Sequence, residues 1–138
     1  MAGSLKDLSK YRYERSLEEL ENAKMLLDSH KFKLAWNCSY DSIFHAMRAV
    51  NVLDDFDSSK HSGIIAHFNQ YHVKTNDFPK EASKIIRSAY ELRELADYDD
   101  FYTASRQEAE EQIEKAITFS GFVRSYLEKV TVLSNTPE

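Results

Sequence analysis

The stretch Asn37–Asn51, NCSYDSIFHAMRAVN, decides the fold that we expect for this chain. At about 100° per residue, the large apolar side chains of this region fall on one broad helical face. That face comprises Trp36, Tyr40, Ile43, Phe44, Met47 and Val50. The residues Ala35, Ser39, Ala46 and Ala49 are small and allow other helices to approach closely. The pattern predicts a helix from about Lys33 to Leu53 at the centre of a helical bundle.

The opposite side of this predicted helix carries a row of polar side chains, Asn37, Asp41, His45 and Arg48. An amide, a carboxylate, an imidazole and a guanidinium on one strip can hold a phosphate or polarise a ribose hydroxyl. A structural alternative is that Asp41 pairs with His45 while Arg48 bridges to a neighbouring subunit. In either case the row borders a cleft or a contact between subunits.

The composition agrees with a helical fold. The chain has 138 residues, enough for one domain, and contains only 3 Gly and 2 Pro. Hydrophobic periodicity predicts further helices over Leu5–His30, Ser62–Tyr71 and from Phe78-Pro79 through Leu92, and a last helix opened by a Ser105–Glu108 capping box. We expect a loop over Ala96–Thr103 and a close helix crossing at Gly121. The prediction is an all-α single domain, 1–138: an up-and-down four-helix bundle with an additional short helix, a core of about 5–129 and a frayed tail at 130–138.

The charges are spread unevenly along the chain. The formal net charge is −5; residues 1–93 hold 14 basic and 13 acidic side chains, and residues 94–138 hold 4 and 10. The acidic last third disfavours nonspecific binding to nucleic acid. The single cysteine, Cys38, cannot form an intrachain disulfide, and no apolar run is long enough for a membrane span or a secretion signal. We expect a cytoplasmic protein without a membrane partner.

Three histidines are candidate ligands for a metal ion. His61, His67 and His72 are spaced by six and five residues, whereas one α-helical face needs three or four. No H-E-x-x-H motif or cysteine-rich ligand set accompanies them. We therefore expect structural or exposed histidines, with no metal and no cofactor. Arg93 and Asp97, one turn apart, are expected to form an ion pair that fixes the following loop.

Three patterns occur in order along the chain. The first has the register Asn-x-x-Tyr-x-x-x-Phe-His-Ala-x-Arg-Ala and starts at Asn37. The second is Lys60-His61-Ser62-Gly63 with Phe68-Asn69, and the third is Arg93-x-x-Ala96-Asp97-Tyr98. Together they resemble the HEPN domain family, especially its small stand-alone prokaryotic members of the nucleotidyltransferase-associated type. The likeness covers about Tyr11 to Leu127.

The resemblance implies a bundle of four or five helices that forms homodimers with a cleft near the two-fold axis. Family members either cleave RNA without a metal, often as toxins, or accompany minimal nucleotidyltransferases, with a proposed role in binding nucleotides. The ribonuclease branch uses an Arg followed after four to six residues by His, which exchanges protons while Arg stabilises charge on the phosphate. This chain has Leu53, Asp54 and Asp55 where that His should follow Arg48, although His45 precedes Arg48 as a reversed pair.

These observations favour a non-enzymatic, dimeric HEPN protein that binds a nucleotide or meets a nucleotidyltransferase partner, as in a toxin–antitoxin pair. The expected ligand-binding residues are Asn37, Asp41, His45, Arg48, Arg93 and Asp97, with His61 at the rim. One alternative is a metal-independent endoribonuclease that uses His45 and Arg48 on RNA. The other is a purely structural dimeric interaction module without a small ligand.

Overall fold

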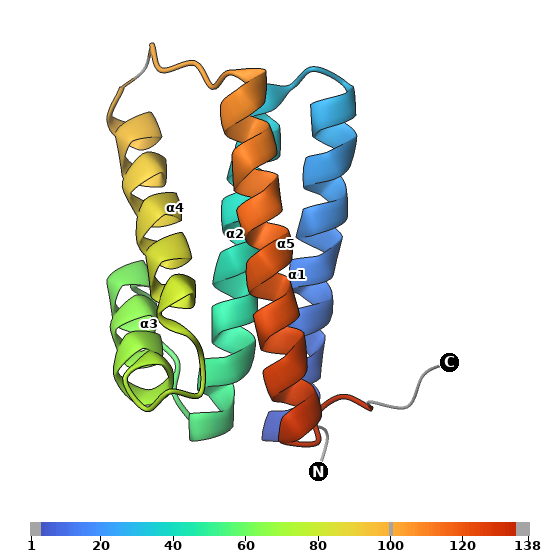
Figure 1. Ribbon diagram of the computed structural model, residues 1–138, viewed down its shortest axis with the longest axis vertical. Coiled ribbons are helices and arrows are strands. Elements are labelled where there is room, and N and C mark those ends of the chain that lie inside the picture. Colours follow the sequence, from blue (N-terminus) through green and yellow to red (C-terminus); the bar gives the residue numbers. More distant parts are fainter. Residues whose placement is uncertain (1–3, 100, 135–138) are drawn as a thin grey trace.

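The computed structural model describes residues 4–99 and 101–134, and these form an all-α bundle (Figure 1). The long helices α1 (Leu5–Asp28), α2 (Phe32–Asn51), α4 (Lys80–Tyr98) and α5 (Arg106–Lys129) run up and down beside one another. A 3₁₀ turn, η1 (Val52–Asp54), follows α2. The short helix α3 (His61–Phe68) continues into a π-helical turn, η2 (Asn69–Val73), at one end of the bundle. The predicted fold class is therefore confirmed.

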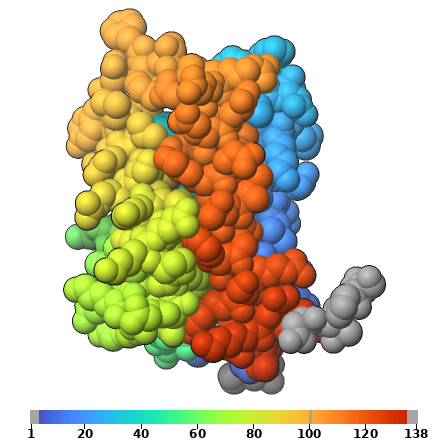
Figure 2. Space-filling view, in the orientation of Figure 1, coloured from blue at the N-terminus to red at the C-terminus, as the bar shows by residue number. Residues whose placement is uncertain are grey.

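Helix α2 is central, as its pattern predicts. It contacts α1, α3, α4 and α5, and on the face seen in Figure 2 it is almost entirely hidden behind α5. Trp36, Ile43, Met47 and Val50 are all buried, whereas Phe44 is half-buried. Among the described residues, none of the helices combines the length and the apolar character that crossing a membrane requires.

Small residues let α1 and α2 pack closely. Two buried serines connect the helices by hydrogen bonds: Ser9 Oγ donates to the carbonyl of Ala49 at 2.6 Å, and Ser42 Oγ donates to the carbonyl of Ser16 at 2.8 Å. A larger side chain at these positions would meet backbone directly. The close approach fixes α2 against α1 and leaves the polar side of α2 between α1 and the α3–α4 region.

The start of α5 shows the predicted capping chemistry, and the start of α1 shows the same motif. Ser105 and Glu108 form the predicted capping box, and Tyr102 Oη donates to Glu108 at 2.5 Å. Ser4 and Asp7 make an equivalent box at the start of α1. The expected loop from Ala96 is wrong, because α4 continues to Tyr98 and buries Ala96. Asp100, which that prediction included, lies outside the described residues.

The end of α5 also differs from expectation. Thr131 adopts φ 61, and the amides of Thr131 and Val132 bond to the carbonyls of Glu128 and Leu127, which is a Schellman motif. Val132 and Leu133 pack against the core. The prediction of fraying is therefore wrong for 130–133, and 135–138 lie outside the described residues. Gly121 marks no close crossing, because a Cβ there would have open space.

Candidate functional site

The polar row of α2 is half-buried along its whole length, since Asn37, Asp41, His45 and Arg48 are all of intermediate exposure. Its members face different neighbours. Asp41 interacts with α4, and Arg48 interacts with the connection between α2 and α3. The structural alternative in which Asp41 pairs with His45 is not what the geometry shows, because the ion-pair partner of Asp41 is Arg93.

Arg93 is held between two carboxylates. Its Nη1 donates to Asp41 Oδ1 at 3.4 Å, and its Nε lies 3.6 Å from Asp97 Oδ2. The guanidinium carbon also lies 5.1 Å from the centroid of the Tyr40 ring, within the range of a cation–π interaction. The predicted Arg93–Asp97 pair is confirmed. With one cation and two anions, this part of the site has a surplus of negative charge.

His61 joins the same group through aromatic contacts. Its Nδ1 lies 2.8 Å from Tyr40 Oη, and its ring stacks on Phe44 with centroids 4.0 Å apart. Burial raises the pKa of Tyr40, so the phenol stays protonated and donates to Nδ1. Burial and the charge of Arg93 lower the pKa of His61, which favours a neutral imidazole with its proton on Nε2. Sequence reasoning missed Tyr40 because periodicity placed it on the core face.

Arg48 belongs to a second charged group, in which two guanidiniums share one carboxylate. Arg48 donates to both oxygens of Asp57, at 3.3 and 2.9 Å, and Arg12 Nη2 donates to Oδ2 at 3.0 Å. Burial alone would raise the pKa of Asp57. The hydrogen bonds from Arg48 and from the Ser58 amide, with the charge of Arg12, outweigh burial and lower that pKa. The group keeps one surplus positive charge.

Arg12 has a further property that the sequence did not reveal. Its side chain is only 13% exposed, and its Nη1 is buried without a hydrogen-bond partner among the described residues. A buried donor without a partner costs about 1–3 kcal/mol of stability. Arg12 and Asp57 are separated by 45 residues, and no periodic pattern links them.

His45 lies between these two groups. Burial and the charges of Arg15 and Arg48 lower its pKa, although the carboxylates of Asp41 and Glu19 act in the opposite direction. A neutral imidazole can accept or donate a proton near pH 7. His45 therefore has the protonation state that a general base needs, and it lies three positions before Arg48 on the helix.

The predicted site residues form two neighbouring charged groups, one around Arg93 and one around Arg48. Asp41, Arg93, Asp97 and His61 are connected through direct contacts or through Tyr40. Arg48 contributes to the pKa of both His61 and His45, so it lies within electrostatic reach of the first group. Asn37 lies one turn before Asp41. A surface hollow between α4 and α5 (yellow and orange in Figure 2), whose lining includes Lys84, Ser88 and Glu114, involves none of these residues.

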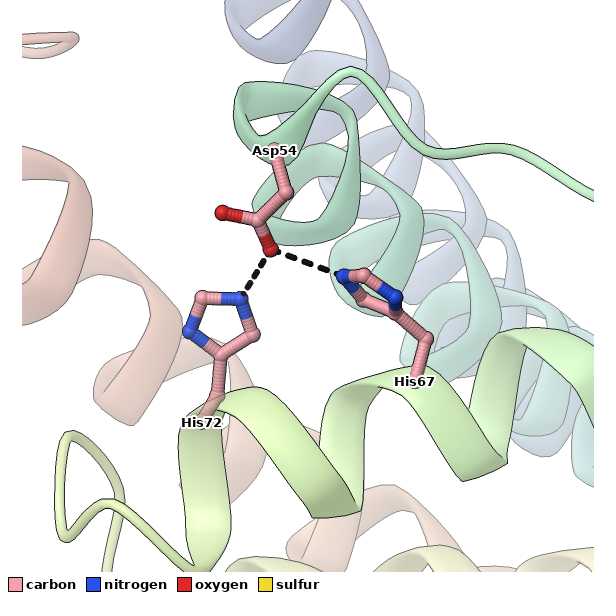
Figure 3. A group of neighbouring side chains, drawn as sticks. All are labelled: Asp54, His67 and His72. Carbon is pink, nitrogen blue, oxygen red and sulfur yellow. Dashed lines mark hydrogen bonds and ion pairs between the residues drawn. The ribbon is translucent and has the colours of Figure 1, made fainter.

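The structure brings His67 and His72 together, although their spacing of five residues predicts different faces of an α-helix. His67 and His72 both place Nε2 beside Asp54 Oδ2, as Figure 3 shows. The two histidines meet because η2 is π-helical and brings residues five apart onto one side, which an α-helix does not do. His61 lies apart from this cluster, beside Tyr40.

The family model described as the HEPN domain matches residues 9–126, most of the chain. This chain belongs to the HEPN family. Its HEPN relatives include a protein of Methanocaldococcus jannaschii named "Putative toxin MJ0142", 30% identical over 88% of each chain. A "UPF0332 protein" of Thermotoga maritima is 30% identical over 86% of this chain and 89% of its own. A second M. jannaschii protein, "Putative toxin MJ0605", is 29% identical over 82% and 84%.

Proposed function

We propose that this HEPN protein binds a nucleotide along the polar row of α2 and acts as the non-enzymatic partner of a minimal nucleotidyltransferase. The observation that carries the proposal is the pair of guanidiniums, Arg12 and Arg48, on the single carboxylate of Asp57. Their surplus charge lies beside a group of aromatic and carboxylate side chains. A nucleotide has the matching distribution, an anionic phosphate next to a sugar and a flat base.

The phosphate would bind at the guanidinium end. Guanidinium groups bind phosphate oxygens through paired N–H donors, which is the geometry that Arg48 already offers to Asp57. The carboxylate of Asp57 is 44% exposed, so a phosphate can replace it without opening the core. The Nη2 of Arg12, which now donates to Asp57, would then donate to a phosphate oxygen.

The nucleoside would bind at the Arg93 end. Asp41 and Asp97 can accept hydrogen bonds from ribose hydroxyls, and the ring of His61, an exposed residue, offers a stacking surface on the side away from Phe44. Asp41 and Arg48 are seven residues apart on α2, a rise of about 10 Å. One extended ligand can therefore contact both ends of the row.

A homodimer is part of the proposal, with two copies of α2 bordering a shared groove. Support comes from apolar side chains exposed near Asp97 at the end of α4, where Leu95 is 50% exposed and Tyr98 is 89% exposed. Exposed apolar groups that lie together favour association. Sedimentation equilibrium would measure the mass, and Tyr98→Glu would be expected to weaken a dimer.

Calorimetric titration of the tag-free protein with ATP and with inorganic tripolyphosphate tests the ligand. Arg48→Ala should weaken binding of both at least tenfold, the effect of about 1.4 kcal/mol. The matched control is Arg124→Ala, which removes an exposed arginine on α5 that pairs with Glu128. Equal affinity of Arg48→Ala and the control would refute the phosphate site. Co-purification with a co-expressed nucleotidyltransferase tests the partner separately.

The second candidate is a metal-independent endoribonuclease that uses His45 and Arg48. Two relatives carry toxin names, and the lowered pKa of His45 beside Arg48 suits general base catalysis. Incubation of RNA with the protein in excess chelator distinguishes the candidates. Cleavage that disappears in His45→Ala would favour the enzyme, and intact RNA together with nucleotide binding would favour the first proposal.

A further inference from the structure

The cluster of Asp54, His67 and His72 is separate from the polar row of α2. The carboxylate of Asp54 comes from η1, and the two imidazoles come from α3 and η2 (Figure 3). Asp54 Oδ2 lies 2.8 Å from His67 Nε2 and 2.7 Å from His72 Nε2. The three ligand atoms all lie within 4.8 Å of one another. The cluster shares no residue with the proposed nucleotide site.

The π-helical turn creates this arrangement. In an α-helix, residues five apart point about 140° away from each other. The wider turn, closed by the bond from the Lys74 amide to the Asn69 carbonyl at 2.9 Å, brings His72 to the same side as His67. Such turns are rare and are found frequently at functional sites. The unusual backbone thus places two nitrogen donors and one oxygen donor at one point.

We propose that Asp54, His67 and His72 bind a divalent transition-metal ion of the Zn²⁺ type. Two imidazole nitrogens and one carboxylate oxygen are a ligand set that Zn²⁺ accepts, and three protein ligands leave one position for water. Zinc–ligand distances of about 2.0–2.1 Å separate tetrahedral ligand atoms by about 3.3 Å. Asp54, whose side chain is 36% exposed, has to move back from both nitrogens for this, and the two imidazole nitrogens, which lie within 4.8 Å of each other, have to take the same spacing.

The surroundings already orient both rings. His72 is 3% exposed, and its Nδ1 lies 3.4 Å from Asp77 Oδ2. A proton on Nδ1 would be directed at this carboxylate, which leaves Nε2 available to a metal, as outer carboxylates do for metal-bound histidines. The ring of His67 stacks on Phe56 with centroids 4.0 Å apart. Both imidazoles already direct Nε2 at the same oxygen of Asp54.

A bound ion would connect the end of α2 to the α3–η2 segment. Asp54 follows the end of α2, whereas His67 and His72 belong to α3 and η2, so one ion would connect the two segments. An ion that binds only the folded chain raises its stability by mass action. The effect that we infer for the metal is therefore a more stable fold.

Titration of the tag-free, chelator-treated full chain with ZnCl₂ tests the site. We expect one Zn²⁺ per chain with a dissociation constant below about 100 μM and a higher melting temperature. His67→Gln and Asp54→Asn should each weaken binding at least tenfold, and Asp77→Asn should weaken it less. The matched control is His30→Asn, because His30 is an exposed histidine with φ 61, a conformation that Asn tolerates.

Imidazole NMR signals provide a readout that does not depend on variant folding. In the unaltered chain Zn²⁺ should shift the signals of His67 and His72 and leave that of His30 in place. The proposal is wrong if the chain binds no Zn²⁺ in this range. It is equally wrong if the shifted signals belong to other histidines, or if folded Asp54→Asn and His67→Gln bind as tightly as the control.

Discussion

Arg93 on α4 and Asp41 on α2 form an ion pair across 52 residues of sequence, with Nη1 and Oδ1 3.4 Å apart. The pair fixes the C-terminal half of α4 against the polar row of α2. Because the two side chains are 29% and 39% exposed, water screens much of their attraction. The pair therefore positions the site more than it stabilises the fold.

Breaking this pair should cost little stability. We expect Arg93→Gln to lower the free energy of unfolding by no more than about 1 kcal/mol. The coupling with Asp41→Asn in a double-mutant cycle, measured by urea unfolding, should be of similar size. A loss of several kcal/mol would show that the guanidinium supports the core through Tyr40 instead.

Acid should destabilise the protein through His45. Its folded-state pKa lies below the ordinary value of 6.5, because burial disfavours the imidazolium, so the unfolded chain binds the proton more tightly. The stabilising contribution is complete above pH 6.5 and is lost as the pH falls from 6.5 through the folded-state pKa. The free energy of unfolding, measured by urea unfolding as the pH is lowered from 6.5, should decline less for His45→Gln than for the unaltered chain. An identical decline in both proteins would contradict the role of His45 in the loss of stability in acid.

The contact between α1 and α2 should not tolerate larger side chains. Ser42→Ala removes the hydrogen bond to the Ser16 carbonyl and should cost about 1 kcal/mol. Ser42→Val should cost roughly 1–3 kcal/mol more, because two methyl groups must fit at a position that is 1% exposed. Thermal unfolding measures both. Ser125→Ala, at an exposed position on α5, should change stability by less than about 0.5 kcal/mol.

Gly121→Ala should stabilise the protein. Gly121 lies within α5, and an added Cβ meets nothing within 4 Å. Alanine restricts the unfolded chain more than glycine does, so the free energy of unfolding should rise by about 0.5–1 kcal/mol. Chemical denaturation gives this value directly. Destabilisation would indicate that the exposed surface of α5 contacts another molecule.

The sequence predicted the bundle well because helix periodicity and capping chemistry are local. The apolar face of α2 and the Ser105–Glu108 box appear in the structure as expected. The end of α4 was predicted less well, because burial of Ala96 by tertiary contacts extends the helix into a polar segment.

The candidate site was predicted only in part. The i, i+4 pair of Arg93 and Asp97 follows from spacing, whereas the Arg12–Asp57 contact depends on how distant segments pack. Periodicity assigns a residue to one face of a helix but does not predict which groups the end of its side chain contacts. Tyr40 therefore counted as core although its hydroxyl contacts His61.

The π-helical turn η2 (Asn69–Val73) also determines in which direction the side chains that follow α3 point. One residue more or less in a helix rotates everything beyond it by about 100°. A homologous chain that is one residue shorter or longer here would present a different side chain to Asp54, even if every histidine were retained. The length of the segment between the two histidines, more than the presence of the histidines, should therefore decide in which family members both imidazoles contact the residue at the position of Asp54.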